Sequence, residues 1–170
     1  MRFNFAPLLF ASSILLAGCL GASVKKDLVF PPDFAPHEYQ RLAVINLDPR
    51  VHFSEYVEVE LLKKGYRVKE RSMVQQWLKK EGFIKEESFD PPTLARIGAL
   101  LDVQGVVLCS VLEFSRFRDS YRLSIKMVNP ATGNTIWSAL GAMEGRRGQK
   151  STDLLKEIVV SSLRDLPAAK

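Results

Sequence analysis

Apolar residues along the chain fall into compact runs and alternating stretches, and both kinds predict strands. Residues 41–47 form a compact apolar run, and residues 105–114 are apolar enough to be a central strand covered on both faces. Residues 121–128 alternate apolar and polar side chains, which is typical of a strand with one wet face. Residues 135–140 are expected to return as its hairpin partner across a turn at 129–134.

Apolar residues at helical spacing predict four helices between and after these strands. They are expected over about residues 54–64, 72–81, 93–101 and 151–163, with a short strand at 66–69 between the first two. Capping residues are expected at Ser54, at Ser72 with Gln75 as a capping box, and at Ser151 or Thr152. Leu62, Met73 and Leu100 belong to the faces that we expect to turn inward.

The order of these elements predicts the fold class. Strand, helix, strand, helix, helix and strand are followed by a β-meander and a last helix. Right-handed crossovers make the first three strands parallel, and the meander adds an antiparallel edge. We therefore expect one α/β domain over residues 41–166, with a mixed sheet of about five strands and flanking helices.

Residues 1–18 have the layout of a secretory signal, in which Arg2 precedes a short apolar core and small residues follow. The apolar run is shorter than the about 20 residues that a membrane-spanning helix needs. Its end, Leu16-Ala17-Gly18-Cys19, resembles the lipobox of bacterial lipoproteins; the alternative is an ordinary signal peptide with an incidental cysteine. The resemblance implies cleavage before Cys19, a diacylglyceryl group on its thiol and acylation of the new amino group. Leu20 stands where aspartate retains such proteins in the inner membrane, which implies the outer membrane, facing the periplasm.

Residues 19–40 are expected to be the lipidated amino terminus and a proline-rich tether. Pro31, Pro32 and Pro36 exclude helix and favour extended chain. About 20 residues at roughly 3.3 Å each reach at most some 60–70 Å, enough to lift a domain clear of the membrane. Apolar side chains between residues 28 and 34 favour docking of part of this segment on the domain.

Charge and composition narrow the class of partner. The formal net charge is +5, and it becomes +4 once Arg2 leaves with the signal; 46% of the residues are hydrophobic and 25% charged. Both signs are interleaved along the chain, so we expect no nucleic-acid partner. The mild basicity is compatible with anionic lipid or with polyanionic polymers of the cell envelope.

Few residues are placed to do chemistry. Cys109 lies in an apolar strand, where we expect a buried thiol that behaves as a small hydrophobe. His52 lies near Asp48 and Ser54, which could be drawn as a hydrolase triad, but a polar loop leading into a capped helix explains these residues better. We therefore predict no catalytic residues, no metal site and no cofactor.

Two surface segments are candidates for binding. The loop before the last helix departs from the spacing of a phosphate-binding loop, but its cations near a helix N-terminus would suit an anionic group. These cations are Arg146, Arg147 and Lys150. The segment from 114 to 122 combines aromatic residues with arginine, as interface cores do; the alternative is a hairpin with its aromatic rings tucked in and its arginines solvated. The candidate partner surface consists of Phe114, Arg116, Phe117, Arg118, Tyr121 and Arg122.

Four sequence blocks resemble one group of exported lipoproteins. In chain order they are RLAVINL, LLKKGYRV, LARIGALLDVQGVVLCSVLEF and VNPATGNTIWS. They are similar to the curli secretion channel subunit CsgG, the peptidoglycan-synthase activator LpoB and the amino-terminal domain of TolB, and most of all to neisserial-type outer-membrane surface-antigen lipoproteins. The family's Gly-Ala-Asp before the central strand is matched only loosely by residues 101–105. The shared motifs mark helix stops and a hairpin turn, so they specify fold better than function.

The resemblance implies a non-catalytic lipoprotein that binds another envelope protein, for example to activate a peptidoglycan synthase or to serve a secretion or transport complex. The alternatives are an oligomeric structural component of a curli-type secretion apparatus, which would make the chain a homo-oligomer, and an envelope hydrolase. A pore is not expected, because the link at about 115–120 is too short to add a membrane-spanning strand pair of about 9–11 residues each.

Overall fold

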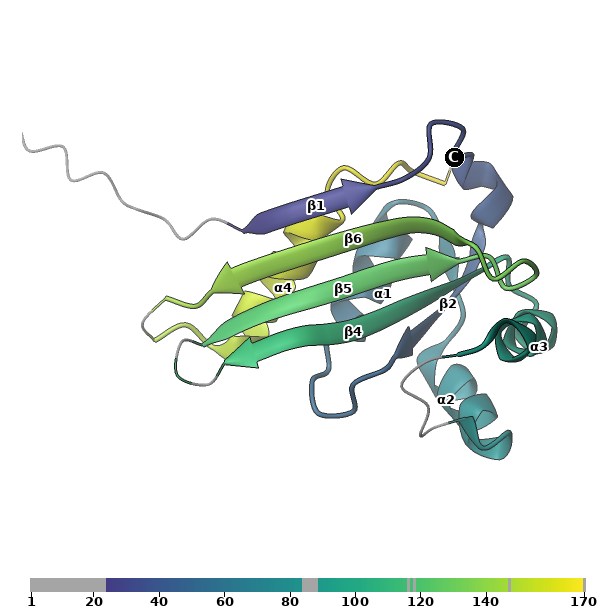
Figure 1. Cartoon of the computed structure of the whole chain (residues 1–170), viewed down its shortest axis with the longest axis horizontal. Helices are drawn as coiled ribbons and strands as arrows, with labels where there is room; N and C mark the ends of the chain where they lie inside the picture. The colour runs from purple at the N-terminus through teal and green to yellow at the C-terminus, as the bar shows by residue number, and fades with distance from the viewer. Residues whose placement is uncertain (1–23, 84–88, 116, 118, 147, 170) are drawn as a thin grey trace, which may run out of the picture.

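One mixed sheet of six strands organises the chain, of which the computed structural model describes residues 24–83, 89–115, 117, 119–146 and 148–169. The strands are β1 (Lys25–Val29), β2 (Arg41–Asn46), β3 (Arg67–Val68), β4 (Gly105–Ser115), β5 (Ser120–Val128) and β6 (Thr135–Glu144). The helices are α1 (Ser54–Lys63), α2 (Arg71–Lys80), α3 (Pro91–Leu101) and α4 (Ser151–Ser162), with a 3₁₀ turn, η1, at Pro36–Tyr39. The strand order is β1-β6-β5-β4-β2-β3 (Figure 1).

The predicted α/β class and mixed sheet are confirmed. β2 pairs in parallel with both β3 and β4, so three strands are parallel and are connected through helices. β4, β5 and β6 form the antiparallel meander. The sheet has one strand more than expected, and that strand comes from the amino-terminal segment.

The segment expected to be a tether is largely part of the folded domain. β1 pairs antiparallel with β6, from Lys25 opposite Ala142 to Val29 opposite Ser138. Val24, Leu28, Phe34 and Tyr39 pack against the core, and the Phe34 and Tyr39 rings stack with centroids 6.2 Å apart. The physical reason is twofold: β6 offers an unpaired edge, and the apolar side chains of the segment gain by burial.

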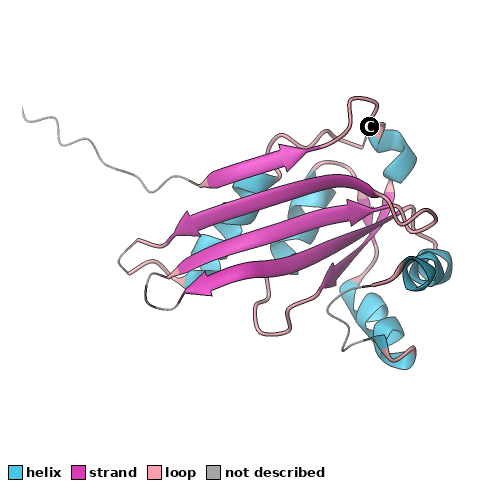
Figure 2. Ribbon diagram, viewed as in Figure 1, coloured by secondary structure: helices cyan, strands magenta, loops and turns pink. Residues whose placement is uncertain are grey.

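Two helical layers cover the sheet to different extents (Figure 2). α1 and α4 lie behind the sheet in Figure 1, and with the inner face of β4, β5 and β6 they enclose the larger core, which includes Trp137, Ile125 and Val107. α2 and α3 gather at one end, where Val74 and Ile97 pack against Val106 in a second core. The central strand is therefore covered on both faces over its first half only.

Several helix starts differ from the sequence prediction. Ser54 is the first residue of α1 and not its N-cap. The N-cap position is occupied by Phe53, which makes no side-chain capping bond. The Glu70 carboxylate caps α2 by accepting from the Ser72 N–H at 2.9 Å and the Met73 N–H at 3.1 Å, in place of the expected Ser72–Gln75 box. Lys150 occupies the N-cap position of α4 without a side-chain capping bond, and Ser151 is the first residue of the helix.

Three residues expected to face the core are exposed instead. Leu62, Met73 and Leu100 have exposed fractions of 54%, 50% and 41%. They lie at the border of their apolar stripes, where a rotation of a few tens of degrees decides burial. Gly65, at φ +86°, ends the first helix as predicted, because a left-handed residue after a helix favours glycine.

The carboxyl-terminal residues close over the end of α1. The Tyr66 hydroxyl donates to the Pro167 carbonyl at 3.0 Å, and burial raises the pKa of Tyr66 to about 12. The Lys64 ammonium donates to the Leu166 carbonyl at 2.7 Å, and Ala169 is buried. The described domain thus extends past residue 166.

Within the described part of the chain, no helix has the length and apolar character needed to cross a bilayer.

Candidate binding surface beside the free end of β4

β4 continues well beyond the strand that pairs with its outer edge. β2 pairs with it from Leu42 opposite Gly105 to Asn46 opposite Cys109, and the Leu47 N–H makes a last bond to the Cys109 carbonyl at 2.8 Å. Beyond that point, β5 is the only described strand that pairs with β4. Residues 110–115 therefore present a free strand edge about 20 Å long.

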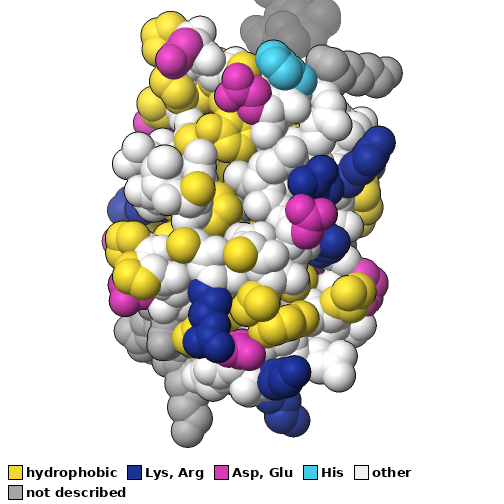
Figure 3. Space-filling model, turned by 90° about the vertical axis from the view of Figure 1, so that its right-hand side faces the viewer, with side chains coloured by type: hydrophobic (Ala, Val, Ile, Leu, Met, Phe, Trp, Pro, Cys, Tyr) yellow, Lys and Arg dark blue, Asp and Glu magenta, His cyan; other side chains and the backbone are white. Residues whose placement is uncertain are grey.

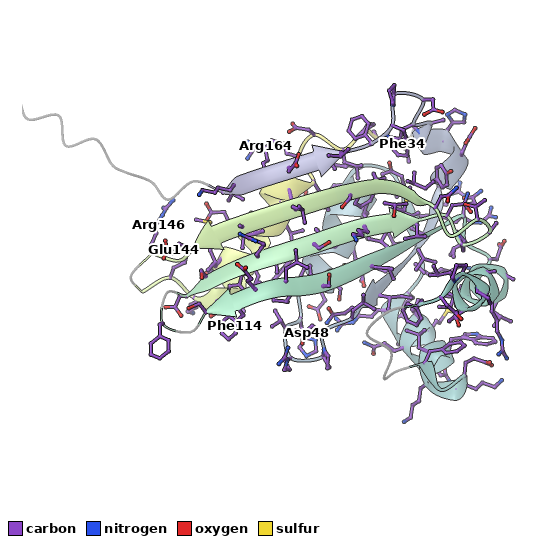
Figure 4. All side chains as sticks on the ribbon, viewed as in Figure 1. Phe34, Asp48, Phe114, Glu144, Arg146 and Arg164 are labelled. Atoms are coloured by element: carbon purple, nitrogen blue, oxygen red, sulfur yellow. The ribbon has the colours of Figure 1, made fainter. Side chains whose placement is uncertain are left out.

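An open groove of about 740 Å³ runs along this edge. One wall is the loop after β2, and the other is the far half of β4 with the start of β5. Figure 4 shows Asp48 and Phe114 on this side of the sheet. Its lining includes Asp48, Val51, Leu112, Glu113, Phe114 and Tyr121.

The floor of the groove is apolar and aromatic. Phe114 stacks on Tyr121 with ring centroids 4.8 Å apart and planes at 26°, and 45% of Phe114 is exposed. Leu112 lies at a register shift between Val111 and Glu113 and is 52% exposed. Such a bulge re-aims side chains and increases local twist. Solvent-exposed apolar groups beside an unpaired edge are typical of binding surfaces.

Charged pairs border the groove. The Asp48 carboxylate accepts from the Arg50 guanidinium through both oxygens at 3.0 Å, and this contact holds the pKa of Asp48 below its usual value. Glu113 and Arg122 form an ion pair at 3.5 Å across β4 and β5. These charges satisfy one another, so the exposed aliphatic and aromatic groups are left as the main source of binding energy.

The structure divides the candidate partner surface predicted from sequence. Tyr121 points into the core with 7% exposure, whereas its neighbour Arg122 lies on the opposite, open face of the sheet. Phe114 and Phe117 both line the groove, and Phe117, in the link between β4 and β5, is fully exposed. Arg116 and Arg118 lie outside the described residues.

The predicted anion contacts lie in the loop between β6 and α4. The Arg146 N–H donates to the Gln149 side chain at 3.0 Å, and the Gln149 N–H returns to the Arg146 carbonyl at 2.9 Å. Lys150 is exposed at the start of α4, and Arg147 lies outside the described residues. Figure 4 places Arg146 beyond the end of β6.

The imagined hydrolase triad is not assembled. Asp48 faces the groove beside β4, whereas His52 lines a separate cleft of about 470 Å³ between the end of β2 and α2. Ser54 is buried with 2% exposure. The described residues hold no cluster of three His, Cys, Asp or Glu side chains that could bind a metal ion.

Cys109 is a free, fully buried thiol in the core, and burial raises its pKa above the usual range. The proposed lipobox, Leu16, Ala17, Gly18 and Cys19, lies outside the described residues.

The free edge of β4 and the groove beside it were not predicted from the sequence. The only available signal was that the apolar run at 105–114 is longer than its expected partner at 41–47.

Comparisons with known proteins bear on the fold. No protein-family model matches the chain, and no curated protein matches it. Among solved structures, the PelC dodecamer from Paraburkholderia phytofirmans superposes with a TM-score of 0.55 at 13% identity, over 87% of this chain and 100% of that one. Lipoprotein GNA1162 from Neisseria meningitidis superposes with a TM-score of 0.57 at 16% identity, over 75% of this chain and 96% of that one.

The LpoB carboxyl-terminal domain from Salmonella enterica also matches, with a TM-score of 0.47 at 14% identity, over 62% of this chain and 83% of that one. We base the fold assignment on PelC and GNA1162. Both cover at least three quarters of the chain, and GNA1162 is a neisserial lipoprotein, as the sequence resemblance predicted. The chain has the fold of this group of lipoproteins.

Proposed function

We propose that this chain is a non-catalytic accessory lipoprotein of the bacterial envelope that binds another envelope protein while anchored through Cys19 to the outer membrane, facing the periplasm. The observation that carries the binding role is the free edge of β4 beside an open groove with exposed Leu112 and Phe114. The lipobox resemblance supports the anchor. The fold shared with lipoprotein GNA1162 is in keeping with both.

The mode of binding follows from the chemistry of a strand edge. Backbone N–H and C=O groups of alternate residues can pair with an extended segment, and side chains of that segment can enter the groove. The bulge at Leu112 blunts the edge against indiscriminate pairing, so affinity depends on side chains that fit between the Phe114 ring and the loop at 48–51. The expected partner is a protein with an extended, largely apolar segment.

A photo-crosslinking residue at Leu112 tests the binding role in intact cells. We expect it to capture a partner, whereas the same residue at Val59, which is 48% exposed on α1, captures nothing comparable. Equal capture from both positions, or none from Leu112, would contradict the role of the edge. Mass analysis of the mature amino terminus tests the anchor separately: an unmodified Cys19 or an uncut signal overturns it.

A second candidate function is a structural ring of identical subunits. β1 closes one side of the sheet and the free end of β4 lies towards the other, so the two edges can pair head to tail between copies. The PelC structure with this fold is a dodecamer. Native mass measurement of the lipoprotein in detergent distinguishes the two functions. A closed oligomer that Leu112→Lys dissociates favours the ring, and a monomer that still yields the Leu112 crosslink favours a separate partner.

A further inference from the structure

Four strand ends meet at one end of the sheet. β4 ends at Ser115 opposite Ser120, which in turn pairs with Glu144 at the end of β6. β1 begins at the same end, with Lys25 opposite Ala142. In Figure 1 this end lies at the left, where β1 begins.

The two loops at this end are joined directly. The Gly145 N–H donates to the Asp119 carbonyl at 2.9 Å, which links the β6–α4 loop to the β4–β5 hairpin. A Cβ at Gly145 would lie 2.9 Å from that same carbonyl oxygen, so the approach is too close for a side chain. The two loops therefore form one continuous surface. Together with the start of β1 it is called here the tip surface, defined by Lys25, Phe117, Arg146 and Lys150.

The stretch of chain between this end of the sheet and the proposed lipid on Cys19 is short. Val24 already packs against the core, so only residues 20–23 separate it from Cys19. Five extended residues reach about 17 Å, far less than the some 60–70 Å expected for a free tether. A lipid on Cys19 would therefore hold the tip surface against the membrane, because β1 starts at that end.

The side chains of the tip surface fit an anionic lipid surface. Phe117 is fully exposed, and an exposed aromatic ring with water on all sides gains by entering the headgroup region. Lys25, Arg146 and Lys150 are also exposed. By sequence, loops 116–119 and 145–150 together carry five Lys and Arg against one Asp, while Glu144 and Asp153 flank them.

The opposite end of the molecule has a different character. Figure 3 looks onto it, and side chains of both charges are interspersed there with apolar ones. The β5–β6 turn, with exposed Ala131, lies at that end of the sheet, because β5 and β6 run the full length between the two ends. It provides a matched reference position.

We propose that the tip surface docks on anionic phospholipid, with Phe117 in the headgroup region and Arg146 and Lys150 near the phosphates; this rests on the Cys19 anchor of the proposed function. The strands then stand away from the membrane, and the free edge of β4 is presented sideways, close to the bilayer. A partner on that edge is selected from proteins at the membrane surface rather than at a distance from it.

A fluorophore on a single introduced cysteine tests the docking in the full lipoprotein. Phe117→Cys and Ala131→Cys are each labelled with an environment-sensitive dye; Cys109 is buried and does not compete. The protein is reconstituted into vesicles of phosphatidylethanolamine and phosphatidylglycerol that contain nitroxide-labelled lipid. We expect severalfold stronger quenching at position 117 than at 131, and a smaller difference in vesicles of phosphatidylcholine alone, where only the connection to Cys19 holds this end near the bilayer.

Charge reversal supplies the second measurement. In the Phe117→Cys background, Arg146→Glu with Lys150→Glu is expected to reduce quenching severalfold, whereas Lys79→Glu on α2 leaves it unchanged. Equal quenching at 117 and 131 on a protein whose Cys19 is acylated overturns the docking and leaves the proposed function intact. An unmodified Cys19 overturns the anchor and the docking together. A difference between 117 and 131 that is equal in neutral and in anionic lipid overturns the role of the cations.

Discussion

The two halves of β4 differ in how far they are covered by the rest of the domain. Residues 105–109 pair with strands on both sides, and Val106, Val107 and Cys109 have no exposed surface. Residues 110–115 pair on one side only, and Leu112 and Phe114 are about half exposed. The same apolar strand thus serves as core in one half and as a candidate binding edge in the other. The difference lies in its neighbours, because β2 stops and α2 and α3 reach no further.

Thiol chemistry should give the largest contrast between the halves. Native Cys109 is buried, and burial raises its pKa, so reaction with a thiol reagent requires the core to open. A Leu112→Cys variant places a second thiol three residues along the same strand, in an exposed position. We expect position 112 to react orders of magnitude faster than Cys109 without denaturant, and both to react alike once the chain is unfolded. Comparable native rates would mean that the covered half opens readily.

A matched pair of leucines measures the same contrast in free energy of unfolding. Leu42, which pairs with Gly105 in the covered half, has no exposed surface. Leu42→Ala should cost about 2–5 kcal/mol through lost burial and a cavity. Leu112→Ala should stay within about 0.5 kcal/mol, because its side chain is already in solvent. Denaturant melts of both variants decide this, and a large loss at Leu112 would show that the edge is covered in solution.

The covered and open faces of β6 can be compared by adding volume. Gly141 faces α4, and a Cβ there would lie 2.5 Å from a methyl carbon of Ile158. Gly141→Ala should therefore cost about 1–3 kcal/mol through overpacking. Ala142→Val, next along the strand, faces the open side and should be tolerated. Thermal melts test both, and an unchanged melting temperature for Gly141→Ala would mean that α4 can shift away from the sheet.

Two carboxylates should respond to pH in opposite directions, with small effects. The Arg50 guanidinium lowers the pKa of Asp48 from its usual 3.8, so this pair stabilises the fold above pH 3.8 and the gain is lost as the pH falls further. Burial raises the pKa of Glu58 from its usual 4.5, so its charge destabilises the fold at neutral pH and that penalty disappears below pH 4.5.

Asp48→Asn should therefore lower the free energy of unfolding at pH 7, and Glu58→Gln should raise it, each by less than about 1 kcal/mol because both groups are partly solvated. Melting temperatures measured from pH 3 to pH 7 test this pair. Both differences should shrink towards acidic pH, and a shift of the same sign for the two variants would contradict the assigned causes.

Most of the fold could be predicted from local patterns. The alternation at 121–128 gave the buried face of β5 correctly, because Tyr121, Leu123, Ile125 and Met127 all lie in the core. The helix end at Gly65 and the parallel direction of β2, β3 and β4 also followed from the sequence. Helix caps were harder, since the Glu70 side chain competes successfully for the bonds expected of Ser72.

The amino-terminal segment and the groove could not be predicted in this way. The prolines at 31, 32 and 36 favour extended chain whether it is free or paired, and only the unpaired edge of β6 decides that Lys25–Val29 is a strand. Similarly, nothing within the apolar run at 105–114 indicates that the pairing with β2 stops at Cys109. Both features depend on contacts between residues far apart in the chain.

The sequence by itself determined which residues alternate, which turn and which are apolar, since these depend on side chains within a few positions of each other. It also determined the lipobox-like motif, which is a local pattern. Only the tertiary structure decided that β4 outlasts β2, that the presumed tether is the sixth strand, and that Phe117, Arg146 and Lys25 share one end of the sheet. These outcomes depend on the lengths and registers of strands whose paired residues lie far apart in the chain, 63 positions for Leu42 and Gly105 and 117 for Lys25 and Ala142, and no local pattern encodes them.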